Sequence, residues 1–150
     1  MADAVIVLQA RTGSRRLPGK VLARIGPHSM LAHCLRRLAA ADLPVVVATT
    51  SLPEDDRVQR EAERCGALVF RGAVDDVLGR CIGAAHANGA REIIRATADN
   101  PFVDGSGTRR ILDLMRRVRA DHVMESGLPV GAAVEAATLA ALERARAAIT

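Results

Sequence analysis

The sequence contains almost no aromatic side chains. Among its 150 residues there is no tryptophan or tyrosine, and Phe70 and Phe102 are the only phenylalanines. The core must therefore consist mainly of alanine, valine, leucine and isoleucine. Modules that bind single-stranded nucleic acid stack the bases on aromatic rings. We therefore expect no nucleic-acid partner, even though the formal net charge is +4.

Cysteines and long apolar runs are also scarce. Cys34, Cys65 and Cys81 are odd in number and show no C-x-x-C spacing, so the sequence predicts neither a disulfide framework nor a zinc site. We interpret the three cysteines as small apolar side chains of a protein in a reducing compartment. No apolar run approaches the roughly 18 residues that a membrane span needs, and no basic region precedes the first apolar run. We expect a cytoplasmic protein without a membrane contact.

Lysine is nearly absent as well, because Lys20 is the only one among 21 basic residues. It ends a segment, residues 9–20 (the basic loop), that reads QARTGSRRLPGK and carries four cations and no acid. Since the whole chain has a net charge of +4, the other residues sum to zero and the basic loop holds the entire excess. An apolar strand leading into a loop of glycines and cations is typical of a phosphate site. The alternative is a solvated loop without a ligand.

The alternation of apolar runs and amphipathic segments predicts one α/β domain over residues 1–150. Runs of strand length lie at residues 5–8, 45–48, 67–70, 92–97, 121–124 and 130–136. Helical spacing and capping residues, among them Ser29, Gly66 and Thr138, predict helices at residues 29–41, 54–65, 75–87, 106–118 and 138–149. This order indicates a Rossmann-like, mainly parallel sheet with helices on both faces. Ligands then bind beyond the carboxyl ends of the strands.

Carboxylates follow several of the predicted strands. Asp99, in T-A-D-N-P, suits Mg²⁺, which prefers oxygen ligands and one or two carboxylates beside substrate phosphates. The alternative for Asp99 is a turn or helix cap. Asp75 and Asp76 could hold a base or a sugar hydroxyl, or they could stabilise the start of the next helix, which is the favoured interpretation. Asp104 is interpreted as a helix cap.

Three motifs resemble one known family. The basic loop lacks G-x-x-x-x-G-K-[ST] and G-x-G-x-x-G, but residues 10–20 resemble the signature A-R-x-x-S-x-R-L-P-G-K of cytidylyltransferases that activate acidic sugars. That family includes the 3-deoxy-manno-octulosonate and acylneuraminate enzymes. Residues 71–78 (RGAVDDVL) and 95–101 (RATADNP) resemble R-G-x-x-x-D-V-L and R-x-T-A-D-x-P of its spore-coat polysaccharide subgroup.

The resemblance implies a nucleotide-diphospho-sugar transferase fold and a reaction. The anomeric oxygen of a sugar acid attacks the α-phosphorus of CTP, and CMP-sugar and pyrophosphate result. Arg11 and Lys20 would be catalytic, Asp99 would bind Mg²⁺, and the nucleotide-binding residues would be Ala10, Arg11, Ser14, Arg16, Lys20, Asp75 and Thr97. Such a site needs no nucleophilic side chain, because phosphoryl transfer depends chiefly on positioning and charge neutralisation.

Two departures from the family pattern leave a second interpretation open. Family members usually run longer, so we expect a C-terminal truncation that removes a late metal-binding aspartate, much of the sugar site and the arm of a possible homodimer. Residues 131–135 read GAAVE where the subgroup usually has G-x-D-V-E, so Ala133 replaces an acid. Asp99, with Glu135 as a possible helper, would then hold the metal. The alternative function is a catalytically impaired nucleotide-binding remnant or a non-enzymatic partner subunit.

Overall fold

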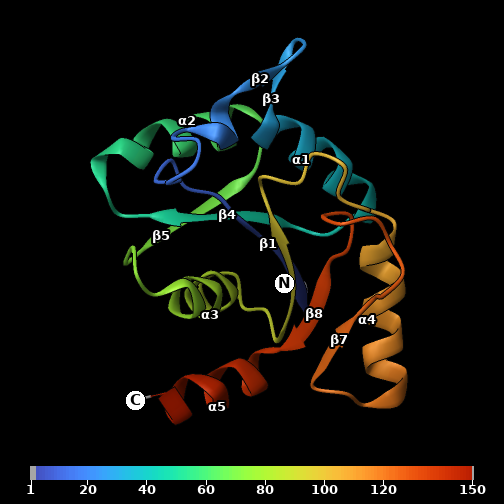
Figure 1. Cartoon of the computed structure of the whole chain (residues 1–150). Helices are drawn as coiled ribbons and strands as arrows, with labels where there is room; N and C mark the ends of the chain where they lie inside the picture. The colour runs from blue at the N-terminus through green and yellow to red at the C-terminus, as the bar shows by residue number, and fades with distance from the viewer. Residues whose placement is uncertain (1–2, 150) are drawn as a thin grey trace.

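A computed structural model describes residues 3–149 and shows a six-stranded sheet with helices packed on it (Figure 1). The strand order is β5-β4-β1-β6-β8-β7. The strands are β1 (Ala4–Gln9), β4 (Val45–Thr50), β5 (Leu68–Gly72), β6 (Glu92–Thr97), β7 (His122–Met124) and β8 (Glu135–Thr138). The first four strands in this order pair in parallel, whereas β8 is antiparallel to both β6 and β7. The predicted mainly parallel sheet is confirmed.

β1 lies inside the sheet and contributes to two cores. Ile6 and Leu8 are fully buried on the face covered by α1 (Met30–Leu38), α2 (Asp56–Arg64) and α4 (Gly107–Val118). Val5 and Val7 face the second core, which is covered by α3 (Val77–Ala87) and touched by Leu139 of α5 (Leu139–Ile149). Helices thus cover both faces, as predicted. A parallel strand buried on both faces needs a continuous apolar run, which is what the sequence has here.

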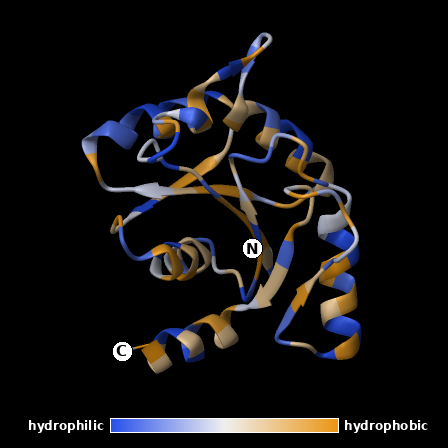
Figure 2. Ribbon diagram, in the orientation of Figure 1, coloured by the Kyte–Doolittle hydropathy of each residue, from blue (hydrophilic) through white to orange (hydrophobic). Residues whose placement is uncertain are grey.

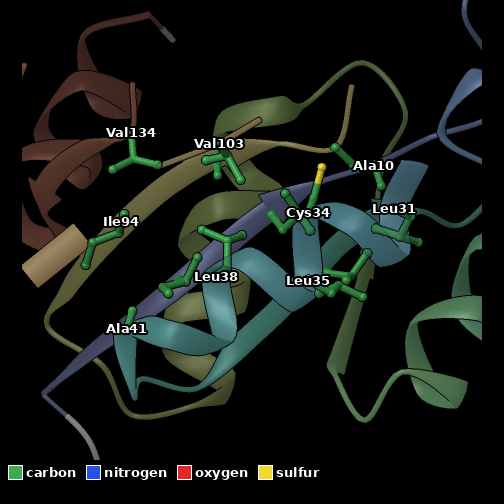
Figure 3. Close-up of a cluster of buried hydrophobic side chains, with 14 of the residues drawn as sticks. Ala10, Leu31, Cys34, Leu35, Leu38, Ala41, Ile94, Val103 and Val134 are labelled. Carbon is green, nitrogen blue, oxygen red and sulfur yellow. The ribbon is translucent and has the colours of Figure 1, made fainter. Parts of the chain in front are cut away.

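α1 packs its apolar side into the first of these cores. Four buried residues recur at helical spacing along it: Leu31, Cys34, Leu35 and Leu38. Figure 3 shows this side of the helix together with side chains from three other segments, Ile94, Val103 and Val134. Most of α2, by contrast, is hydrophilic (Figure 2).

Among residues 3–149, no helix combines the length and hydrophobicity that crossing a bilayer requires.

Local capping sets the starts and ends of several helices. The hydroxyl of Ser29 accepts a hydrogen bond from Ala32 N at 3.0 Å and caps α1. Asp76 Oδ1 accepts from Gly79 N at 2.6 Å and caps α3. Gly66 follows α2 at φ 78°, a conformation that favours glycine. The helix boundaries predicted from these residues are confirmed.

The last predicted strand is misplaced by several residues. Residues 130–136 were expected to form it, but β8 is Glu135–Thr138. Gly127 and Gly131 adopt φ values of 84° and 85°, so the chain turns through this segment before it can extend. Thr138 nevertheless has its predicted role, because its hydroxyl accepts from Ala141 N at 3.2 Å at the start of α5.

A small hairpin was not predicted. It consists of β2 (Arg24–Ile25) and β3 (His28–Ser29), which pair antiparallel between the basic loop and α1. Figure 1 shows it projecting from the body of the domain. Gly26 at φ 61° allows the tight turn. Two-residue strands are too short to show an alternating pattern, so hydrophobic periodicity could not identify them.

Candidate active site

A cavity of about 570 Å³ lies at the carboxyl ends of β1 and β6. The two strands end level with each other, because Gln9 and Thr97 are register partners. The basic loop continues from β1, Thr97 ends β6 and Asp99 follows it, and the start of α3 forms a third side. All eight predicted site residues line this cavity: Ala10, Arg11, Ser14, Arg16, Lys20, Asp75, Thr97 and Asp99. The structure thus brings together the side chains that the sequence had placed in one site.

The cavity has an excess of positive charge. Its five cations are Arg11, Arg15, Arg16, Lys20 and Arg80, and its two carboxylates are Asp75 and Asp99. Within residues 3–149, Arg11, Arg15 and Arg16 form no ion pair with an acid. Unpaired cations gathered in a hollow raise the local concentration of anions there. The cavity is therefore suited to a ligand with several negative charges.

Lys20 and Asp99 form the one ion pair inside this cavity that the described residues show. Lys20 Nζ donates to Asp99 Oδ2 at 2.5 Å across 79 residues of sequence. Burial by itself would raise the pKa of Asp99, but the hydrogen bonds from Lys20 and Thr97 and the charge of Lys20 together outweigh it, and the pKa is lowered. Asp99 therefore stays ionised and available as an oxygen ligand. The alternative for Asp99 was a turn or helix cap, but its carboxylate contacts Lys20 in the cavity.

The basic loop is fastened to the sheet by a buried carboxylate that the sequence interpretation missed. Asp55 is 1% exposed and lies in the short helix that follows β4. Its Oδ1 accepts from both the backbone N and the hydroxyl of Thr12, each at 2.7 Å, and its Oδ2 accepts from the Thr50 hydroxyl. Burial alone would raise the pKa of Asp55, but the hydrogen bonds from Thr50 and Thr12 outweigh it and lower the pKa.

Thr12 also closes the basic loop on itself. Its carbonyl accepts from Ser14 N at 2.7 Å and from Gly19 N at 2.8 Å. Gly19 adopts φ 69°, which lets the chain turn into the short helix Lys20–Leu22. One residue thus joins the beginning of the loop, its end and the buried Asp55. This closure keeps Arg11 and Lys20 at the edge of the same cavity.

The adjacent carboxylates Asp75 and Asp76 have different surroundings. Asp76 caps α3 and also accepts from Arg146 at 2.7 Å, so the predicted cap is confirmed for this residue. Asp75 instead lines the cavity. Arg80, one turn into α3, also lines it and is only 4% exposed. The sequence interpretation missed Arg80, although a lone arginine in the apolar segment RCIGAA is an available signal.

The structure does not bring Glu135 to Asp99. Glu135 accepts from Arg95 and lies 3.0 Å from His122 Nε2, and neither it nor Ala133 lines the cavity. Its carboxylate contacts two neighbouring side chains, and a role of Glu135 in holding a metal stays a prediction. Among residues 3–149 there is no cluster of three or more histidine, cysteine or acidic side chains that could hold a metal ion.

The chain is similar to known proteins over most of its length. A family model described as cytidylyltransferase matches residues 4–148, nearly the whole chain. The chain belongs to the cytidylyltransferase family. It is 37% identical over 128 residues to the spore coat polysaccharide biosynthesis protein SpsF of Bacillus subtilis, a match that covers 81% of this chain and 52% of that protein.

Two further relatives agree with this assignment. The chain is 33% identical over 124 residues to a 3-deoxy-manno-octulosonate cytidylyltransferase of Xanthomonas euvesicatoria, covering 77% of this chain and 46% of that enzyme. A solved cytidylyltransferase of Leptospira borgpetersenii superimposes with a TM-score of 0.90 at 31% identity, covering 98% of this chain and 65% of that one. This cytidylyltransferase domain thus spans about half the length of the curated relatives that it matches.

Proposed function

We propose that this domain is the nucleotide-binding part of an enzyme that transfers CMP from CTP to an acidic sugar and releases pyrophosphate. The observation that carries the proposal is the single cavity that gathers the basic loop, Lys20 and Asp99 at the carboxyl ends of two parallel strands. The family assignment supports the transfer of a cytidylyl group. The acidic sugar and a role in polysaccharide biosynthesis are proposed by analogy with the named relatives.

In this proposal the chain positions the reactants and neutralises their charge. Arg11, Arg16 and Lys20 bind the triphosphate and the leaving pyrophosphate, with the Ser14 hydroxyl as a further donor. The anomeric hydroxyl of the sugar loses its proton to water as its oxygen forms a bond to the α-phosphorus. The bond from that phosphorus to the bridging oxygen breaks, and pyrophosphate leaves with the electron pair. Cations placed where this charge develops lower the barrier without any covalent intermediate.

The nucleoside end of the ligand is assigned to other residues of the same cavity. Thr97, Asp75 and Ala10 line the cavity beside the triphosphate residues. Thr97 is the last residue of β6, and its hydroxyl already accepts from Asn100 Nδ2 at 2.6 Å, which holds it in one orientation. A fixed hydroxyl and a carboxylate can discriminate one base or ribose from another. We assign Thr97 to the base and Asp75 to the nucleoside.

The donor set also fits Mg²⁺ as a cofactor. Mg²⁺ binds through one or two carboxylates together with phosphate oxygens and water rather than through a full protein cage. Asp99 is a cavity carboxylate with a lowered pKa, and a bound triphosphate would complete that set. When bound, the ion would neutralise charge on the phosphates. Lys20 would then leave Asp99 and donate to a phosphate oxygen.

A nucleotide panel tests this proposal directly. CTP, UTP, ATP and GTP are added separately with Mg²⁺, and the unfolding temperature of the domain is measured. A ligand that binds only the folded state raises that temperature, so we expect the largest rise with CTP. Pyrophosphate release with CTP and 3-deoxy-manno-octulosonate then tests turnover. Equal shifts with all four nucleotides, or none, would contradict the proposal.

A second candidate function is nucleotide binding without turnover, as a remnant or a partner subunit. It is favoured by the alanine at position 133 and by the pairing of Glu135 with Arg95, because neither position then offers a further carboxylate to a metal at Asp99. Tight CTP binding with no pyrophosphate release would support this candidate. Light scattering in the same buffer tests the homodimer that the family resemblance implies. We place either form in the cytoplasm.

A further inference from the structure

Arg80 is a buried cation that has no ion-pair partner among the described residues. Its side chain is 4% exposed and lines the cavity, and its Nη1 donates to the carbonyls of Ala73 and Val74 at 2.5 and 2.9 Å. Those acceptors are neutral. Among residues 3–149 no acid forms an ion pair with Arg80. Burial lowers the pKa of Arg80, and the neighbouring Arg11 cation lowers it further. A buried charge without a partner is strongly unfavourable.

The unused donors of Arg80 lie along one edge of its guanidinium group. Nε is enclosed and has no hydrogen-bond partner in the described structure. Nη2 also makes no hydrogen bond there, and it is not among the enclosed unpaired atoms, so it is open to the cavity. Nη2 is therefore the charged donor that an anion in the cavity can reach. Nη1, on the other side, is already occupied.

The stem of Arg80 is held against the sheet. A Cβ added at Gly72 would lie 2.9 Å from Arg80 Cγ and 3.4 Å from Phe70 Cε1, so the side chain fills the space that the glycine leaves. Phe70 in turn packs against Gly83 of α3, where an added Cβ would approach its ring to 2.2 Å. The guanidinium is therefore fixed before any ligand arrives. Fixed donors bind an anion with little loss of side-chain entropy.

We infer that Arg80 is an anion-binding residue whose open Nη2 donates to a phosphate group of the nucleotide in the cavity. This inference rests on the proposed function for the nucleotide, while the underlying chemistry requires only a phosphate. The bound anion supplies the ion-pair partner that residues 3–149 do not give Arg80, and it is shared with Arg11. The hydrogen bonds from Nη1 to the carbonyls of Ala73 and Val74 connect Arg80 to the turn that carries Asp75. Arg80 therefore contacts both the phosphate and the segment that we assign to the nucleoside.

Calorimetry with two probes, pyrophosphate and CTP, tests this role on the 150-residue chain. The variant Arg80→Met removes the guanidinium group and keeps an unbranched apolar side chain. The matched control is Arg117→Met, which removes the same charge from an exposed position on α4 outside the cavity. Because hydrogen bonds to charged groups are strong, we expect Arg80→Met to weaken both affinities by roughly 10- to 100-fold. The control should bind like the original chain.

Two more variants separate binding from a purely structural role. Arg80→Lys keeps a positive charge but lacks the guanidinium donors, so it should recover only part of the affinity that Arg80→Met loses. Gly72→Ala keeps every charge but displaces the stem, so it should weaken pyrophosphate binding while Arg80 is still present. Pyrophosphate should also raise the unfolding temperature of the original chain and of Arg117→Met more than that of Arg80→Lys. If Arg80→Met fails to fold, the lysine and alanine variants decide the question.

The outcomes distinguish this inference from the proposed function. Unchanged affinities in a folded Arg80→Met, or in Arg80→Lys if the methionine variant fails to fold, overturn the role of Arg80 and leave CTP binding intact. Pyrophosphate binding that depends on Arg80, without any preference for CTP, supports Arg80 and contradicts the cytidylyl proposal. A chain that binds neither probe overturns both.

Discussion

Removing the carboxylate of Asp55 should loosen both the fold and the basic loop. The change Asp55→Ala leaves three buried donors without an acceptor: the backbone N and the hydroxyl of Thr12, and the hydroxyl of Thr50. A hydrogen bond to a charged group contributes about 1.5–3 kcal/mol. The two hydroxyls can rotate toward other acceptors, and the variant no longer buries a charge. The total loss of stability is therefore smaller than the sum over three hydrogen bonds. We expect a loss of about 3–5 kcal/mol in the free energy of unfolding.

The isosteric variant Asp55→Asn should cost less. One amide oxygen can still accept from Thr12, and the Thr50 hydroxyl can turn to accept from the new amide group. We expect a loss of about 1 kcal/mol. Urea unfolding followed by circular dichroism measures both variants. Asp113→Ala removes an exposed acid on α4 and serves as the control, with an expected change within about 0.5 kcal/mol.

The same carboxylate predicts a pH dependence with a definite sign. Because the folded pKa of Asp55 is lowered, its contribution to stability is complete above its unfolded pKa of about 3.9. That contribution is lost as the pH falls through the folded pKa. The original chain should therefore lose more stability below about pH 4 than Asp55→Asn does. Equal urea midpoints for Asp55→Ala and Asp113→Ala, or identical pH profiles for Asp55→Asn and the original chain, would refute this reasoning.

Two further predictions concern Lys20 and Gly105. Lys20→Ala should weaken CTP binding by tenfold or more, because it removes a fixed cation that faces the cavity. Calorimetry at fixed Mg²⁺ and salt measures the affinity. An unchanged affinity would count against a phosphate-binding role of Lys20. Gly105→Ala should lower the free energy of unfolding by about 2 kcal/mol or more, because the new Cβ would lie 2.0 Å from the Arg37 carbonyl oxygen. A thermal midpoint like that of the original chain would show that the segment moves aside, and Gly13→Ala, which has open space, is its control.

Much of the fold followed from local signals in the sequence. The apolar run at residues 5–8 belongs to a strand buried on both faces, and Ser29 and Asp76 cap the helices that they were predicted to begin. These features depend on neighbours within a few residues. The gathering of the basic loop with Asp99 was predictable for another reason, because parallel strands place the segments that follow them at one edge of the sheet.

The interactions that escaped prediction join distant parts of the chain. Asp55 meets Thr12 across 43 residues, and the contact depends on how the turn after β4 lies beneath the basic loop. Lys20 and Asp99 were each assigned to the site, yet their ion pair could not be anticipated from spacing. Arg80 resembles any helical arginine until its burial is known. Periodicity reports which face of an element is apolar, but it does not report which polar groups meet across the core.

The closure of the basic loop at Thr12 has a thermodynamic consequence for its ligand. Residues 13–19 are tied at both ends to one residue, which is itself held by a buried acid. A free glycine-containing loop loses conformational entropy when a ligand orders it, and that loss weakens binding. Here most of the ordering is complete at folding. The affinity of the domain for a polyanion should therefore change little with loop rigidity and strongly with the number of cations that reach it.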